Sequence, residues 1–174
     1  NAMIVKRSLA WFGVILLLLC PTVFAEMNDA SLTLPIGDAN PASAWMFTGQ
    51  SYIYPLVEND STWNAPSMMN VTFEPCARTD WHSHDGGQIL IAVGGIGIHQ
   101  VEGEPPELLT PGSVARVAPG VMHWHGAADA GWFQHIAIET NPDQTGFAMG
   151  ESIEDDAYFA ALDEAMAADA SSAG

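Results

Sequence analysis

The stretch Trp81-His82-Ser83-His84-Asp85-Gly86-Gly87-Gln88 decides how the rest of this sequence is interpreted. Side chains alternate between the two faces of a β-strand, so residues i and i+2 point the same way. His82 and His84 are therefore expected to point at one spot, and converging imidazoles suit a divalent transition metal. The stretch His123-Trp124-His125 repeats the same spacing. We predict that the two stretches meet inside a small β-barrel around one metal ion.

Residues 1–25 have the composition of a targeting segment. After an expression scar of two residues, two basic residues precede an apolar run from Leu9 to Cys20, and a small-residue cleavage signal ends at Ala25. This order is typical of a secretory signal peptide. The apolar run is shorter than the roughly 20 residues that span a bilayer. We predict that the mature chain starts at Glu26, is periplasmic or secreted, and keeps no stable membrane anchor; the alternative is a lipid anchor on Cys20.

The charge balance excludes some classes of partner. The chain has 21 acidic and four basic residues. All the acidic residues follow the predicted cleavage site, but only Arg78 and Arg116 do so among the basic ones, which leaves the mature chain with a formal charge of −19. Such a surface repels nucleic acid and anionic membranes. A small-molecule substrate is the expected partner.

The mature chain is expected to form one domain with three parts. Residues 26–43 lack a clear period and are interpreted as a linker or a loosely attached arm. Residues 44–150 contain many short apolar runs between Gly and Pro turns, which is typical of an antiparallel sandwich or barrel. Residues 151–174 are predicted to form an amphipathic helix that begins after Ser152, packs on the outside of the barrel and ends in a frayed tail.

Two aromatic-rich runs open the predicted barrel. Residues 45–49 and 52–56 are separated by a short polar turn, so they are expected to form a first hairpin. Pro55 removes a backbone donor and is expected at an edge or a bulge.

The spacing of the histidines and glycines resembles that of the cupin superfamily. His82, His84 and Gln88 match the first metal motif, although a glutamate usually stands at Gln88 and a glycine at Cys76. His123, which follows Pro119-Gly120, matches the second motif. The resemblance implies an all-β fold, a single jelly-roll barrel with a short C-terminal α-helix.

A closer resemblance is to small bacterial cupins related to carboxymuconolactone decarboxylase-associated proteins, which include manganese-dependent hydroxynitrile lyases. It rests on the segments 45–49, 72–75, 77–79, 81–84, 87–88, 123–128 and 135–139. The resemblance implies one manganese ion held by His82, His84, Gln88 and His123, with His125 as an acid/base that does not bind the metal. It also implies a homodimer.

The implied ligands suit Lewis-acid chemistry. Three neutral imidazoles and an amide oxygen leave a divalent ion with its full charge. A mixed nitrogen and oxygen set also suits iron, nickel or zinc. His125 shares a strand face with His123, so it is expected in the cavity, where an imidazole can exchange a proton near neutral pH. Further pocket positions are expected at His135, Glu139, Met69 and Val71, whereas His99 is interpreted as structural or on the surface.

Three functions remain open from the sequence. The first is an exported metal-dependent lyase that acts on a small carbonyl-derived substrate, as hydroxynitrile lyases do. The second is a cupin dioxygenase for a small phenolic or thiol substrate, because three-histidine iron sites also activate oxygen. The third is a non-catalytic module that binds a metal or a small ligand in the periplasm.

Overall fold

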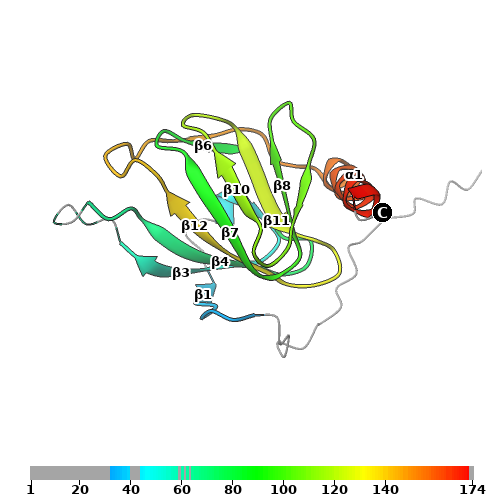
Figure 1. Cartoon of the computed structure of the whole chain (residues 1–174), viewed down its shortest axis with the longest axis horizontal. Coiled ribbons are helices and arrows are strands. Elements are labelled where there is room, and N and C mark those ends of the chain that lie inside the picture. The colour runs from blue at the N-terminus through cyan, green and yellow to red at the C-terminus, as the bar shows by residue number, and fades with distance from the viewer. Residues whose placement is uncertain (1–31, 40–43, 59, 61, 63, 173–174) are drawn as a thin grey trace, which may run out of the picture.

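The computed structural model describes residues 32–39, 44–58, 60, 62 and 64–172, and within them the chain is mostly β-strand. The strands form two curved antiparallel sheets, which Figure 1 shows with the C-terminal helix at one side. Sheet A has the order β1 (Asp38–Ala39), β3 (Ser51–Val57), β4 (Met68–Phe73), β12 (Phe133–Glu139), β7 (Gln88–Gly95) and β10 (Val114–Val117). The predicted all-β barrel with one C-terminal helix is confirmed.

Sheet B is built around β11 (His123–Ala127). One edge of β11 pairs with β8 (Gly97–Val101), which in turn pairs with β9 (Glu107–Leu109). The other edge pairs with β5 (Arg78–Thr79) and β6 (His82–His84), two strands that the bend at residues 80–81 separates. The outer strands are β2 (Phe47–Thr48), beside β5, and β13 (Phe147–Met149), beside β6.

The main core lies between the two sheets and follows from strand alternation. In β7 every second residue is buried, beginning with Gln88 and continuing through Leu90 and Ala92. The alternation places Gln88 on the inner face together with apolar neighbours. The cluster that fills the barrel consists of Val71, Phe73, Ala77, Leu90, Ala92, Leu109, Ala115, Ala127, Phe133 and Ala137.

Helix α1 (Asp155–Ser172) packs on the outer face of sheet B, as predicted. Trp124 and Ile98 point outward from β11 and β8 and meet Tyr158 and Leu162 of the helix. The helix begins at Asp155 rather than directly after Ser152, with Asp155 and Asp156 in its first turn, where carboxylates favour the helix dipole. It extends to Ser172, past the point where the sequence predicts fraying.

A buried arginine connects the helix to the barrel. Nε and Nη2 of Arg78 donate to the carbonyl of Ile153 at 2.9 and 2.6 Å, and Nη1 donates to the carbonyl of Cys76 at 3.2 Å. Its guanidinium lies 4.7 Å from the centre of the Tyr158 ring, and Nη2 also pairs with Asp155 at 2.7 Å. These contacts place the first turn of α1 against sheet B.

The described part of the predicted arm, residues 32–39, is bound tightly rather than loosely. Oε1 of Gln134 accepts from the backbone N–H groups of Thr33 and Leu34 at 3.0 and 2.9 Å, and its Nε2 donates to the carbonyl of Leu34. Asn70 donates to the carbonyl of Pro35 at 2.8 Å. Gln134 and Asn70 lie on the outer face of sheet A and are fully buried. The arm therefore covers a polar strip of sheet A, a correction to the prediction for these residues.

The predicted first hairpin is wrong. Phe47–Thr48 pairs with β5 in sheet B, whereas Ser51–Val57 pairs with β4 and β1 in sheet A. The chain crosses between the sheets at Gly49, whose φ is +80° and where a Cβ atom would lie 2.9 Å from Cβ of Ala77. The expectation for Pro55 is confirmed, because the register of β3 shifts between Pro55 and Val57.

The predicted signal peptide, residues 1–25, lies outside the described residues, and so do residues 26–31 of the predicted arm. None of the helices within the described ranges is both long enough and apolar enough to cross a membrane.

Candidate metal centre and its cavity

The pairing of β6 with β11 brings the two histidine motifs together. His123 lies directly opposite His82 in this pairing, so the two side chains point to the same side of sheet B. The centres of their rings are 4.2 Å apart. The ring centres of His84 and His125 lie 5.2 and 5.3 Å from that of His82. The predicted convergence of the two motifs inside the barrel is present in the structure.

Two backbone carbonyls orient the central pair. Nδ1 of His82 lies 2.9 Å from the carbonyl oxygen of Asp80, and Nδ1 of His123 lies 3.2 Å from that of Val121. A carbonyl oxygen only accepts hydrogen bonds, so it favours a proton on Nδ1 and leaves the lone pair on Nε2. This arrangement is common for histidines that bind a metal through Nε2.

Burial keeps these imidazoles neutral. It is the main cause that lowers the pKa of His82 and of His84 to about 4, and that of His123 to about 2. Neighbouring imidazoles lower the pKa of each further, because two adjacent positive charges repel one another. At neutral pH all three rings therefore carry a lone pair that is available to a cation.

Gln88 completes the group and indicates where a cation would sit. Its Oε1 lies 2.9 Å from Nε2 of His123, and its Nε2 lies 3.0 Å from Nε2 of His84. Both ring nitrogens of His123 thus face an oxygen acceptor, yet a neutral imidazole has only one N–H. With the amide in this orientation one of the two contacts pairs two acceptors, whereas the amide turned by 180° would donate to His123 and accept from His84. The fit to a cation rests instead on the donor set, because the neutral imidazoles of His82, His84 and His123 converge with an amide that can offer its oxygen.

The spacing of the donor atoms agrees with a shared ion. Two ligands at right angles, each about 2.1 Å from an ion, are separated by about 3.0 Å. Oε1 of Gln88 lies 2.9 Å from Nε2 of His123, which matches this spacing. His84 faces Nε2 of the same amide at 3.0 Å. The sequence-predicted set of His82, His84, Gln88 and His123 is therefore assembled at one end of the barrel, with Gln88 between the two histidines that it bridges.

A second grouping of imidazoles shares two of these residues. Within the part of the chain that the structure describes, ring nitrogens of His82, His123 and His125 all lie within 4.8 Å of one another. This trio contains His125, which the sequence assigns to proton transfer, and omits His84, which it assigns to the metal. His84 joins the group through Gln88 instead.

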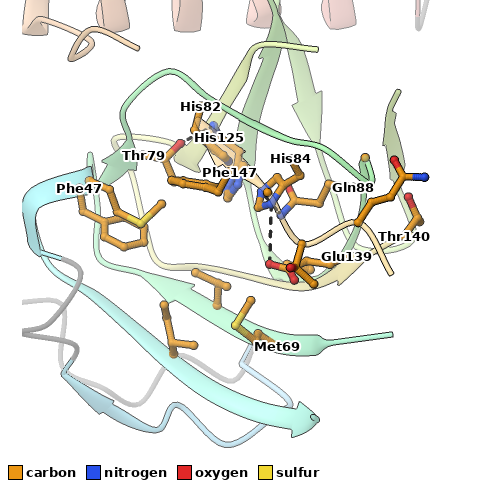
Figure 2. Close-up of a pocket in the computed structure, with 18 of the residues that line it drawn as sticks. Phe47, Met69, Thr79, His82, His84, Gln88, His125, Glu139, Thr140 and Phe147 are labelled. Carbon is orange, nitrogen blue, oxygen red and sulfur yellow. Dashed lines mark hydrogen bonds and ion pairs between the residues drawn. The ribbon is translucent and has the colours of Figure 1, made fainter. Parts of the chain in front are cut away.

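Three of the candidate ligands, His82, His84 and Gln88, line one cavity of about 320 Å³. Figure 2 shows His82 and His125 close together on one side of it, and His84, Gln88 and Glu139 on the other. Most of the remaining wall is apolar and comprises Trp45, Met46, Phe47, Ile53, Met69, Val71, Ala137 and Phe147. The predicted pocket residues Met69, Val71 and Glu139 are thus on the cavity wall. Such a lining suits a small, largely apolar molecule with one polar end.

Glu139 is the acidic residue on this wall. Burial raises its pKa above the ordinary value for a glutamate. Its Oε1 lies 3.7 Å from Nδ1 of His84, a contact drawn in Figure 2. This distance exceeds that of a hydrogen bond, and His84 is neutral at pH 7. The contact therefore orients the His84 ring weakly and leaves the carboxyl group free to accept from a molecule in the cavity.

His135 lies deeper than predicted. It is fully buried and lies behind His125, with ring centres 4.8 Å apart, rather than on the cavity wall. Its ring stacks on Phe73 and Phe133, with interplanar angles of 8° and 14°. Neither of its ring nitrogens has a hydrogen-bond partner, and burial lowers its pKa to about 3. The two phenyl rings belong to the barrel core, so His135 lies in the core behind His125.

His99 is part of the same cluster, which the sequence does not indicate. It lies opposite His125 in the pairing of β8 with β11, is buried, and its ring centre is 5.8 Å from that of His123. Its Nδ1 bonds to Oε1 of Glu107 at 2.9 Å, which lowers the pKa of that carboxyl group. All six histidines of the chain are therefore linked by ring contacts into one cluster. Only the strand register reveals the place of His99.

The sequence also did not predict the part of the cavity wall that precedes and begins β13. Thr145 and Phe147 line the cavity from the segment that leads into β13, and the Phe147 ring centre lies 5.1 and 5.6 Å from those of His84 and His82. No pattern in the sequence marks this segment. Trp45 and Phe47 belong to a segment that the sequence flags only through its likeness to the lyase group.

Comparisons with known proteins agree with this geometry. None of the family models searched matches the chain. An (R)-mandelonitrile lyase of Granulicella tundricola is 40% identical over 115 residues, which cover 64% of this chain and 85% of that protein. A cupin-like protein from Thermotoga maritima has a TM-score of 0.70 and 36% identity, covering 75% of this chain and 96% of the other. A cupin 2 conserved barrel domain protein from Rhodopseudomonas palustris has a TM-score of 0.54 at 13% identity, covering 66% and 74%, and shows the fold alone.

Proposed function

The chain belongs to the cupin superfamily, and on that premise we propose that it is a metal-dependent lyase for a small carbonyl-derived substrate, of the hydroxynitrile lyase type. The observation that carries the proposal is the convergence of the neutral imidazoles of His82, His84 and His123 with the amide of Gln88, a donor set that suits a divalent cation. A relative named as a mandelonitrile lyase supports an enzymatic function. The mostly apolar cavity beside the ligands suits the hydrocarbon part of such a substrate.

His125 is the proposed acid/base. It lines the cavity, and burial together with the neighbouring His135 lowers its pKa well below the ordinary value, so it is a neutral base at pH 7. Its Nδ1 is buried, so we assign proton exchange to Nε2. The backbone N–H of His125 donates to Oγ1 of Thr79 at 3.1 Å and holds the strand in place.

The residues divide the proposed reaction between them. An ion held by His82, His84, Gln88 and His123 supplies Lewis acidity toward a substrate oxygen when it is bound. Nε2 of His125 takes the hydroxyl proton while the carbon–carbon bond to the nitrile carbon breaks. The bonding electron pair leaves with cyanide, which then receives that proton. The products are an aldehyde and hydrogen cyanide, and the apolar wall keeps water away from the proton exchange.

Cleavage of mandelonitrile to benzaldehyde, followed by ultraviolet absorbance, tests this proposal. The manganese-loaded protein is expected to turn over, and His125→Ala is expected to lose about 10²- to 10⁴-fold in kcat/KM because general-base catalysis contributes that much. Metal content measured on both proteins controls for loss of the ion. Full turnover by the variant would remove His125 from the mechanism, and oxygen uptake with a phenol or thiol in place of cleavage would favour a dioxygenase.

We also propose manganese as the resident ion, a homodimer, and export with removal of residues 1–25. The nitrogen and oxygen donor set supports a first-row ion, and iron, nickel and zinc are the alternatives. Elemental analysis of protein purified from its own host tests the metal. Light scattering tests the dimer, and N-terminal sequencing of the exported protein tests cleavage before Glu26.

A further inference from the structure

Two overlapping sets of ligands surround His82 and His123. The first adds His84 and Gln88, which contact one another through Nε2 of the amide and Nε2 of the imidazole at 3.0 Å. The second adds His125, and ring nitrogens of its three members lie within 4.8 Å of one another. One ion cannot use both sets fully, because His82 and His123 present one free Nε2 each.

The two sets suit different ions. The first provides four ligands of mixed type and leaves room for two more, which fits an ion that prefers six ligands, such as manganese. The second provides three imidazoles and leaves room for one more, which fits the tetrahedral preference of zinc. In a tetrahedral site with bonds of about 2.0 to 2.1 Å, the ligand atoms are about 3.4 Å apart. The ring nitrogens of the second set lie up to 4.8 Å apart. Each separation therefore has to shorten by about 1.4 Å or less for the three nitrogens to bind one zinc ion.

His125 is the member of the second set that can make this movement. The Nδ1 atoms of His82 and His123 face backbone carbonyls at 2.9 and 3.2 Å, which restrains both rings. Nδ1 of His125 is buried and has no hydrogen-bond partner. The hydrogen bond to Thr79 comes from the backbone of His125, so no hydrogen bond within the described residues restrains the imidazole, which packs against the rings of Phe73 and His135.

We propose that zinc is held by His82, His123 and His125, and that this second binding mode switches the proposed lyase off. Ligation consumes the lone pair with which His125 takes a proton. The same protein then exists as an active form with a six-coordinate ion and an inactive form with zinc. The inactivation rests on the proposed function, whereas the ligand set does not.

Metal affinities of three proteins, measured by competition with a chromophoric chelator, test the ligand set. Against the wild type, His125→Ala is expected to weaken zinc binding at least about tenfold and to change manganese binding less than about threefold. Gln88→Ala is expected to do the reverse, which makes it the matched control. Retained manganese affinity in His125→Ala also shows that the variant is folded.

X-ray absorption at the zinc edge provides a second readout that does not depend on activity. We expect three imidazoles around zinc in the wild type and two in His125→Ala. Equal zinc affinity in the wild type and His125→Ala, or an unchanged imidazole count, overturns the inference, even if the variant has lost turnover with manganese. If His125→Ala loses zinc affinity and the wild type cleaves no cyanohydrin, the ligand set is supported and the proposed function alone is overturned.

Discussion

Acidification of the metal-free protein tests whether the ligand histidines are neutral in the folded state. Burial lowers the pKa of His82 to about 4, against an ordinary value of about 6.5 for the unfolded chain. Between these two values the unfolded chain binds more protons than the folded one. The free energy of unfolding therefore falls as the pH decreases from about 6.5 towards 4, and the contribution of His82 is fully present only above that window.

The size of the effect follows from the two pKa values. Each unit of difference corresponds to about 1.4 kcal/mol, so His82 alone contributes at most about 3 kcal/mol across the window. Between pH 7 and pH 5 the loss from this one residue is about 2 kcal/mol. A domain of this size has a total stability of about 5 to 15 kcal/mol. The loss is therefore large enough to measure, and His84, with a similar pKa, adds to it.

Urea denaturation followed by tryptophan fluorescence, with a chelator present, measures the loss. Because the strongly acidic chain also changes its overall charge with pH, the comparison is made with His82→Gln, which shares that charge but cannot titrate at this position. The wild type is expected to lose about 2 kcal/mol more than the variant between pH 7 and pH 5. Equal losses in the two proteins would mean that folded His82 carries a proton, and the argument for a preformed neutral site would be refuted.

Three further changes test other parts of the structure. Arg78→Met leaves the carbonyl of Ile153 unpaired and is expected to lower the free energy of unfolding by about 3 to 5 kcal/mol, measured by urea denaturation. The control, Arg116→Met at an exposed position, should lower it by less than about 0.5 kcal/mol. Equal losses in the two variants would contradict a stabilising role for the buried arginine. Gln134→Leu is expected to release residues 32–39 and cost about 2 kcal/mol, and unchanged proteolysis of this segment would contradict the contacts described. Phe147→Ala is expected to raise KM for an aromatic substrate several-fold with little change in kcat, since Phe147 lines the cavity mouth and not the proton path; a loss confined to kcat would argue against this.

The histidine cluster of the candidate metal centre was largely predictable because its signal is local. The i, i+2 spacing of His82 and His84 requires only that the segment be a strand, and the spacing of His123 and His125 adds a second such strand. The barrel and the outer helix follow from periodicity in the same way. The contacts of Gln88 with His84 and His123 place it between these two rings.

The failed expectations concern contacts between distant segments. Residues 45–56 look like a hairpin because two aromatic runs flank a turn, yet the two runs join different sheets. The arm looks loose because its partners Asn70 and Gln134 lie 35 and about 100 residues away. The entropic cost of closing a loop rises only slowly with its length, so residues far apart in the sequence can pair. A local pattern carries no information about which distant residue the partner is.

The sequence by itself determined the residue types, the strand alternation and therefore the face on which each histidine lies. Only the tertiary structure decided that all six histidines share one cluster, that His135 stands behind His125, and that His99 joins from β8. It also decided that His125 approaches His82 and His123 closely enough to compete with His84 for an ion. The physical reason is that alternation depends on the backbone of one strand, whereas these proximities depend on the register between strands and on how two sheets close around one core.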